Sequence, residues 1–334
     1  MKAPPKTTAA YRGDPVRILL VLTLAACSHS TKSQPTTANV DQLRTKAANY
    51  IAWGKAQAGL IDGQGFPTDD ACDALERACL YMAGGAKVNY AAAEDPTTPG
   101  LWYRDSARTC GPANNTSESR FSRDMADGLG LCLWQADDTQ RAKDTIAYVN
   151  ANQGYIDPDA KILLGVPLAY LFETLIAKAD STPLPTAPSD PNVEDTTQTA
   201  SLTTPVLSNY VAHLTEIGIL WDGLMHGGVS AVEMDVLKNE AAAMPRNALF
   251  QAILHKYTDG DQSAALTVAM DETLFPNDRL PTSCDHHASY LWEWDVDSNW
   301  QPDPAPCVTW AGTDLVFLYA VVADEMRGDK QAAQ

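Results

Sequence analysis

The sequence predicts an all-α protein, and three observations predict it. From Val40 onward, apolar residues recur with the 3.6-residue period of amphipathic helices, and alternating strand-like runs are almost missing from the sequence. Several periodic runs are also joined by very short turns, such as Asp137-Asp138-Thr139 and Asp259-Gly260-Asp261. Short turns make consecutive helices antiparallel, so we expect helical hairpins connected by some longer loops.

The first 27 residues have the pattern of an export signal. Arg17 precedes the apolar run 18–26, which is about half the roughly 20 residues that a membrane span requires. Leu24-Ala25-Ala26-Cys27 resembles the bacterial lipobox, in which cleavage precedes the cysteine and its thiol is diacylated. We therefore expect a lipoprotein anchored at Cys27, with an ordinary secretory signal as the alternative. Ser28 after the cysteine favours the outer membrane, with the protein facing the periplasm.

The remaining chain is expected to form a tether and one large domain. Residues 28–39 are polar and lack apolar periodicity, which is typical of a flexible tether, and residues 40–330 are predicted to be a single helical domain. The formal net charge of −18 argues against a nucleic-acid partner or an anionic lipid surface, because both require basic patches. Membrane contact is thus expected through the lipid anchor alone.

The periodic runs and their punctuation predict individual helices. Their expected ranges are 41–59, 70–83, 122–137, 139–152, 162–179, 204–223, 231–258, 261–274 and 312–326. Pro245 is expected to split or kink the run 231–258, because proline removes a helical hydrogen bond. The Pro- and Thr-rich segment 181–205 predicts a long loop within the domain, with a disordered linker as the alternative.

Six cysteines remain after Cys27, an even number that fits disulfides in an oxidising periplasm. Six cysteines allow fifteen pairings, which sequence alone does not resolve. We favour Cys284 with Cys307 and Cys72 with Cys110, because both pairs close loops beside helix ends. This leaves Cys79 with Cys132 as a link between two helices. The alternative is that some are buried free thiols, most plausibly Cys132.

Polar residues near two predicted helix starts are candidates for a binding site. Arg104 and Arg123 stand out in an arginine-poor, acidic chain, and Arg123 precedes Asp124 at the start of a helix. A planar guanidinium suits an anionic or hydroxyl-rich ligand, so we expect Asp73, Arg104 and Arg123 to contact a substrate. The alternative is that Asp73 and Asp124 only complement the positive ends of helices.

The stretch from Cys284 to Cys307 concentrates binding and acid/base side chains more than any other. Trp292-Glu293-Trp294 sets two indoles around a carboxylate, a combination that suits pyranose rings, because their C–H groups stack on indole while hydroxyls bond to acids. The expected ligand-binding residues of this loop are His286, His287, Trp292, Trp294 and Trp300. The alternative is a disulfide-closed surface loop whose tryptophans cover the core.

Other chemistries have little support in the sequence. Asp285, His286 and His287 are adjacent and rarely converge on one ion in such an arrangement, and no zinc-type spacing, nucleophile elbow or P-loop occurs. We expect neither a metal nor a cofactor. The polar residues of the predicted helix 204–223 and its exit, including Asp222 and His226, recur once per turn and are typical of an ordinary amphipathic helix.

The successive hairpins, the S-R-D-M helix start at 122–125 and the W-E-W-D stretch at 292–295 resemble the six-hairpin (α/α) toroid proteins, which include glycoside hydrolases and polysaccharide lyases. The resemblance covers residues 41–326. It implies a complete or incomplete toroid with a loop-lined cleft at one end. It also implies an Asp/Glu pair as acid and base, for which Glu293 and Asp124 are the candidates.

The toroid also hosts non-catalytic members, so three functions stay open. The chain is expected to be a carbohydrate-active enzyme, a non-catalytic glycan-binding lipoprotein or a structural envelope protein. In the first two cases its partner is a glycan or another small polar ligand.

Overall fold

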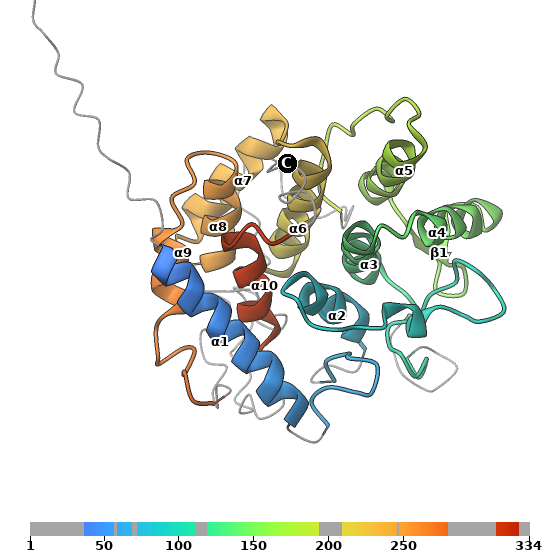
Figure 1. The fold of residues 1–334 in the computed structure, drawn as a ribbon. Helices are drawn as coiled ribbons and strands as arrows, with labels where there is room; N and C mark the ends of the chain where they lie inside the picture. Colours follow the sequence, from blue (N-terminus) through green and yellow to red (C-terminus); the bar gives the residue numbers. More distant parts are fainter. Residues whose placement is uncertain are drawn as a thin grey trace, which may run out of the picture. The chain divides into compact units, whose positions relative to one another are not determined.

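The computed structural model describes residues 37–56, 59–68, 72–110, 119–193, 209–245, 247–279 and 312–326. These residues confirm the all-α prediction (Figure 1). The α-helices are α1 (Thr37–Ala56), α2 (Ala74–Ala83), α3 (Arg123–Ala136), α4 (Thr139–Ala151), α5 (Val166–Asp180), α6 (Asn209–His226), α7 (Ala231–Ala243), α8 (Ala248–Lys256), α9 (Ser263–Ala269) and α10 (Thr313–Val322). A 3-10 turn, η1 (Tyr90–Ala93), and one antiparallel pair, β1 (Tyr155–Asp157) with β2 (Ile162–Leu163), complete the described elements.

Capping residues explain where several helices begin and end. Asp137 closes α3 in the left-handed conformation with φ 58°, and the side chain of Asp138 then accepts the backbone N–H of Arg141 to start α4. Asn247 caps α8 by accepting the N–H groups of Leu249 and Phe250. These polar side chains satisfy backbone groups that lack a partner within the helix.

One predicted helix break is confirmed, and several predicted helix ends differ from the structure; for example, the run 204–223 continues to His226 in α6, and the run 261–274 ends at Ala269 in α9. The run 231–258 is divided into α7 and α8 on either side of Pro245, as its proline predicted. The run 162–179 begins too early, because residues 162–163 pair with β1 and Gly165, at φ 81°, turns the chain into α5. Glycine adopts this positive φ without the penalty that a side chain would impose.

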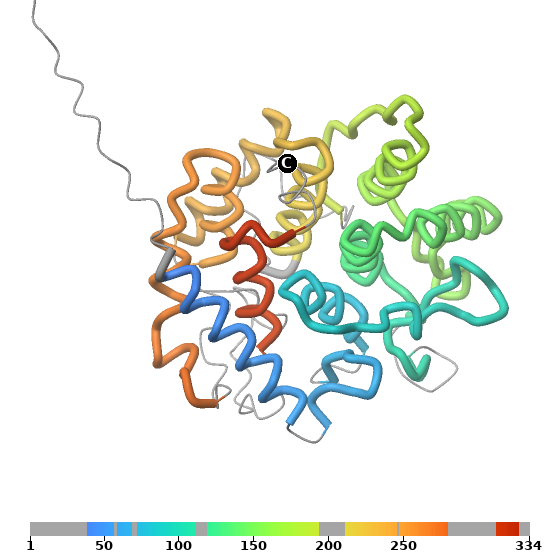
Figure 2. The backbone as a smooth tube through the Cα atoms, viewed as in Figure 1, coloured from blue at the N-terminus to red at the C-terminus, as the bar shows by residue number. Residues whose placement is uncertain are grey.

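The helices α2, α3, α6, α8 and α10 contact one another in a cycle, with α10 returning to α2. Each of α1, α4, α5, α7 and α9 packs against at least one member of this cycle. Figure 2 shows the C-terminal helix α10, in red, beside the blue α1 although they lie at opposite ends of the sequence. Six hairpins require twelve helices and the described residues contain ten α-helices, so the toroid stays a prediction.

The helices α3 and α6 pack so closely that no side chain fits between them at Gly130. A Cβ on Gly130 would lie 2.0 Å from the ring of Trp221, which is fully buried. The ring of Phe172 from α5 meets the same indole edge-on at 5.6 Å between centroids. Only glycine fits at position 130, because the indole occupies the space that any side chain would need.

Two of the expected disulfides are present. Cys72 pairs with Cys110, with a Cα–Cα distance of 5.6 Å, and Cys79 pairs with Cys132, with 5.0 Å. The second pair links α2 to α3, so the alternative of a free Cys132 is wrong. The predicted pair Cys284 and Cys307 and the predicted lipidation site Cys27 lie outside the described residues.

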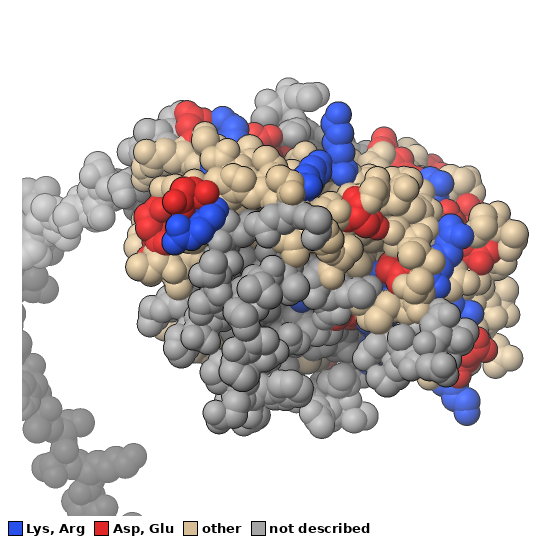
Figure 3. All heavy atoms as spheres, turned by 90° about the horizontal axis from the view of Figure 1, so that it is seen from below, with Lys and Arg blue, Asp and Glu red and all other residues tan. Residues whose placement is uncertain are grey.

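Acidic and basic side chains are interspersed among the described residues of the face shown in Figure 3. Several charged residues of the protein are paired, as Arg141 is with Glu94 at 2.8 Å and with Asp138 at 2.6 Å. Within the part of the chain that the structure describes, no helix is both long and apolar enough to cross a membrane.

Candidate functional site

Two of the predicted substrate-binding residues, Arg104 and Asp73, come together with the predicted catalytic residue Asp124. A guanidinium nitrogen of Arg104 lies 2.6 Å from the Asp73 carboxylate and 3.9 Å from that of Asp124. All three side chains are buried. Arg123, which is also predicted to contact the substrate, is half-buried in the first turn of α3.

Most donors of Arg104 are used inside the protein. Its Nε donates to the carbonyl of Ser119, and its two terminal nitrogens donate to the carbonyl of Cys72 and the hydroxyl of Ser119. These bonds tie together the chain segments beside the Cys72–Cys110 disulfide. The contribution of Arg104 seen in the structure is therefore to hold these segments in place, and substrate contact by Asp73, Arg104 and Arg123 stays a prediction.

A carboxyl group that the sequence did not single out, Glu76 of α2, belongs to this cluster. Glu76 is fully buried, and neither carboxyl oxygen has a hydrogen-bond partner. Burial first, and then the negative charges of Asp124, Asp73 and Asp127, raise the pKa of Glu76 well above its ordinary value. The close approach depends on Gly128 of α3, whose Cβ would lie 2.6 Å from the Cα of Glu76.

The remaining predicted site residues lie outside the part of the chain that the structure describes. They are Glu293, His286, His287, Trp292, Trp294 and Trp300. The pairing of Glu293 with Asp124 as acid and base therefore stays a prediction.

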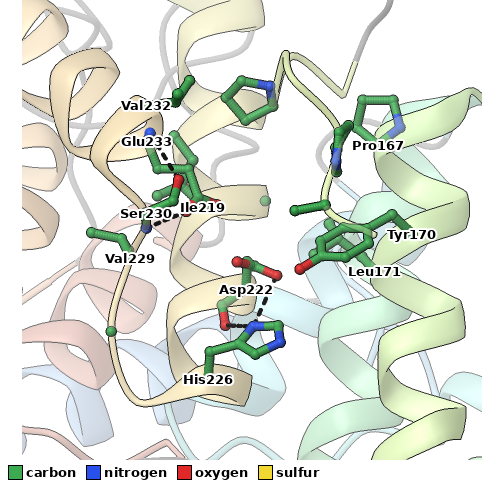
Figure 4. Close-up of a pocket in the computed structure, with 15 residues that line it drawn as sticks. Pro167, Tyr170, Leu171, Ile219, Asp222, His226, Val229, Ser230, Val232 and Glu233 are labelled. Carbon is green, nitrogen blue, oxygen red and sulfur yellow. Dashed lines mark hydrogen bonds and ion pairs between the residues drawn. The ribbon is translucent and has the colours of Figure 1, made fainter. Parts of the chain in front are cut away.

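A pocket that is open to ligands lies elsewhere, between α5, the loop 181–193, α6 and the start of α7 (Figure 4). We call it the α5–α7 pocket. Its volume is about 300 Å³. Its walls are mostly apolar, and its polar groups include Asp222, His226, Ser230, Glu233 and Tyr170. A concave apolar site with a few convergent polar groups is the usual form of a small-molecule site.

The loop predicted from proline content forms part of this pocket. Pro188 and Pro191 line it together with Pro167 from the first turn of α5. Farther along the same loop, Val193 is fully buried against Gly218 of α6, where an added Cβ would lie 2.7 Å from the valine side chain. The described end of this segment, at Asn192 and Val193, is therefore buried, whereas most of residues 181–191 are at least partly exposed. The long loop within one domain stays a prediction, with the disordered linker as its alternative.

Two acidic side chains lie on the α6–α7 wall of the pocket (Figure 4). Asp222 of α6 is 7% exposed and Glu233 of α7 is 8% exposed. Burial first, and then the negative charge of Asp222, raise the pKa of Glu233. Glu233 also belongs to a capping box, in which one of its oxygens accepts the N–H of Ser230 at 2.7 Å while Ser230 accepts the N–H of Glu233.

His226 pairs with Asp222 one helical turn earlier. The hydrogen bond to Asp222 is the largest cause of a raised pKa for His226, and partial burial opposes it. The imidazole lies nearly parallel to the ring of Tyr170, with 6.4 Å between centroids and 8° between planes. A protonated His226 therefore balances the charge of Asp222 at one side of the pocket.

Tyr170 of α5 forms the opposite wall, and its hydroxyl points toward Asp222 (Figure 4). Burial first, and then the charge of Asp222, raise the pKa of Tyr170 to about 12. The phenol is thus neutral at physiological pH and presents a flat ring and one hydroxyl to the pocket.

The once-per-turn pattern predicts Asp222 and His226 to be ordinary helix residues, and Glu233 and Tyr170 are not among the site residues predicted from the sequence. One available signal was S-A-V-E at 230–233, the capping-box pattern, which places Glu233 at a helix start just after the H-G-G turn. That pattern locates the carboxylate of Glu233. It does not predict that Asp222 lies beside Glu233, because the distance between the two residues depends on how α6 and α7 are joined.

The described residues contain no group of three or more histidine, cysteine or acidic side chains that could hold a metal ion. Comparisons of the chain with models of protein families, with curated proteins and with solved structures find no match.

Proposed function

We propose that the protein binds a sugar unit of a glycan in the α5–α7 pocket. The observation that carries the proposal is the pairing of a flat ring on one wall, Tyr170, with two carboxyl groups on the other, Asp222 and Glu233. A pyranose ring has an apolar C–H face that stacks on an aromatic ring and hydroxyls that donate to carboxylates. The pocket supplies a partner for each.

The size of the pocket limits the ligand. Its volume of about 300 Å³ is at the lower end of the roughly 300–1,000 Å³ range of ligand sites. This volume suits one or two sugar rings rather than a long polysaccharide segment. The apolar side chains Val229 and Val232 and the prolines extend the surface against which ring C–H groups can pack.

The arrangement of the carboxyl groups favours binding over cleavage in this pocket. Glycosidic hydrolysis uses two carboxyl groups that flank the scissile bond, about 5–9.5 Å apart. Asp222 and Glu233 instead lie on the same wall, close enough for Asp222 to raise the pKa of Glu233. We therefore assign the pocket a binding role. Cleavage by Glu293 and Asp124 would be a separate activity.

Titration of the full-length protein with monosaccharides, disaccharides and peptidoglycan fragments tests the proposal, with binding followed by calorimetry. We expect Tyr170→Leu to weaken binding roughly 5- to 10-fold, as loss of about 1–1.5 kcal/mol of ring stacking implies. Tyr155→Leu is the matched control, because Tyr155 lies in β1 and does not line the pocket. The proposal fails if no glycan binds, or if Tyr170→Leu binds as tightly as the wild type.

The same glycans report on cleavage. Release of reducing ends by the wild type, and its loss in Asp124→Asn and Glu293→Gln, would support an enzyme. Binding without any product would support the non-catalytic function.

A further inference from the structure

We propose that the ligand of the α5–α7 pocket carries a positively charged amino group, as an amino sugar does, and that this ammonium lies against Asp222 and Glu233. The sugar part rests on the function proposed above. The claim that the ligand carries an ammonium group depends only on the two carboxyl groups and on the composition of the pocket.

The two carboxyl groups retain acceptor capacity. Oε2 of Glu233 accepts the N–H of Ser230 in the capping box, and the Glu233 side chain also interacts with that of Asp222. Asp222 has an oxygen 3.2 Å from Nδ1 of His226, and that imidazole nitrogen is also 3.1 Å from the backbone carbonyl of Asp222. A carboxylate offers about four lone-pair sites, so each group can accept a further donor.

The pocket has more acidic than basic groups. The described residues that line it include Asp222 and Glu233 but no lysine or arginine, and His226 is their one ionisable basic side chain. Two neighbouring buried carboxyl groups do not both ionise readily, because their charges repel each other in a poorly hydrated site. A proton on Glu233 relieves this repulsion, and an ammonium placed between the two groups would relieve it in the same way.

The rest of the pocket suits a small organic cation. An ammonium presents three donors, and the face of Tyr170 on the opposite wall attracts cations through its ring electrons. The apolar walls, which include Leu171 and Ile219, suit the carbon skeleton of the ligand. An anionic ligand would meet two carboxyl groups and is disfavoured.

Ammonium binding has a defined proton balance. The ligand arrives already protonated, Glu233 loses its proton to solvent, and up to one proton is released per ligand bound. The polar groups around the carboxyl group of Glu233, where the ammonium replaces the proton, are Asp222 and His226 from α6, Ser230 from α7 and Tyr170 from α5. Lys178 of α5 acts on His226 through its charge. Raising the pH removes protons from Glu233 and His226, and both losses strengthen ammonium binding until the amine of the ligand itself loses its proton.

Calorimetry on the full-length protein with four probes tests the inference. Glucosamine and glucose differ at a single ring position, and benzylamine and benzyl alcohol provide the same contrast without a sugar. We expect both amines to bind about tenfold or more tightly than their neutral partners, as a charge-assisted hydrogen bond implies. Repeating the glucosamine titration in phosphate and in Tris at one pH should reveal proton release.

Conservative variants locate the binding groups. Asp222→Asn and Glu233→Gln should each weaken amine binding about tenfold, and glutamine can still complete the capping box with Ser230. Asp235→Asn is the matched control, because its side chain on α7 is 73% exposed. Wild-type amine affinity in both pocket variants would overturn the inference.

The four probes separate the two proposals. Equal binding of glucosamine and glucose would overturn the ammonium inference and leave the sugar site standing. Binding of benzylamine with neither sugar would overturn the sugar site and leave the ammonium inference standing. No binding by any probe would overturn both.

Discussion

Nδ1 of His226 lies 3.2 Å from a carboxylate oxygen of Asp222, one turn apart on α6. This hydrogen bond is the largest cause of the raised pKa of His226, so removing the negative charge should lower that pKa. We expect Asp222→Asn to shift the imidazole titration to lower pH, as followed by NMR of the ring C–H resonances. Asp235→Asn should leave it unchanged. An unaltered titration in Asp222→Asn would contradict the assigned cause.

The same pair has a predictable effect on stability. Because the folded-state pKa of His226 is raised above its ordinary value of 6.5, the folded state binds the proton more tightly than the unfolded state. The resulting stabilisation is fully present below pH 6.5 and is lost as the pH rises through the folded-state pKa.

Glu76 should make the protein less stable as the pH rises. Its folded-state pKa is raised well above 4.5, so the folded state keeps a proton that the unfolded state loses. Relative to Glu76→Gln, the wild type should lose up to about 1.4 kcal/mol of unfolding free energy per pH unit above pH 4.5, until the raised pKa is reached. Urea denaturation at pH 5, 6, 7 and 8 measures this difference.

The exposed residue Glu173 of α5 provides the control for that experiment. The unfolding free energy of Glu173→Gln should change with pH in the same way as that of the wild type. If the unfolding free energies of Glu76→Gln and the wild type also changed with pH in the same way, Glu76 would ionise in the folded protein as it does in the unfolded chain.

Gly130→Ala should destabilise the protein although alanine favours helices by about 1 kcal/mol over glycine. The new Cβ would lie 2.0–2.2 Å from atoms of the Trp221 ring. Phe172 packs against the same ring and limits its movement. Forcing an extra methyl into such packing costs about 1–3 kcal/mol, which chemical denaturation can detect. Gly63→Ala, where a Cβ meets nothing within 4 Å, should be neutral.

The sequence predicted the helices because their determinants are local. Apolar periodicity predicts α3 and α4 to within about one residue at each end, and the predicted turn Asp137-Asp138-Thr139 separates them. The cap that Asp138 provides for α4 is seen in the structure. Pro245 likewise located the break between α7 and α8. The start of α5 was missed, because the β1–β2 pairing is decided by a partner strand rather than by periodicity.

The candidate site was less predictable because it depends on contacts between distant segments. Residue type predicts Arg104 and Asp73 as site residues, and they do meet, yet the hydrogen bonds of Arg104 hold the chain together beside a disulfide. Asp222 and Glu233 are ordinary helix residues in sequence, and only the packing of α5, α6, α7 and the loop 181–193 places them around a cavity. No local pattern encodes that arrangement.

The two disulfides that the structure contains should each stabilise the fold. They close loops with sequence separations of 38 and 53 residues, for which loop-closure entropy gives about 4 kcal/mol each. Replacing both Cys79 and Cys132 by serine should lower the unfolding free energy by about 4 kcal/mol, as measured by urea denaturation of the oxidised protein. Non-reducing peptide mapping should find Cys72 joined to Cys110 and Cys79 joined to Cys132, and any other pairing would contradict the structure.

Finally, we predict that Cys27 is diacylated and that the protein is an outer-membrane lipoprotein facing the periplasm. The apolar run after Arg17 is too short to span a bilayer, and it is followed by the lipobox-like stretch Leu24-Ala25-Ala26-Cys27. Two acyl chains give stable membrane attachment, whereas a single chain binds only marginally. Globomycin, which blocks lipoprotein signal cleavage, should make the uncleaved precursor accumulate, and Cys27→Ser should release the protein from the membrane fraction. An unchanged mature band under globomycin would show that an ordinary secretory signal is cut nearby instead.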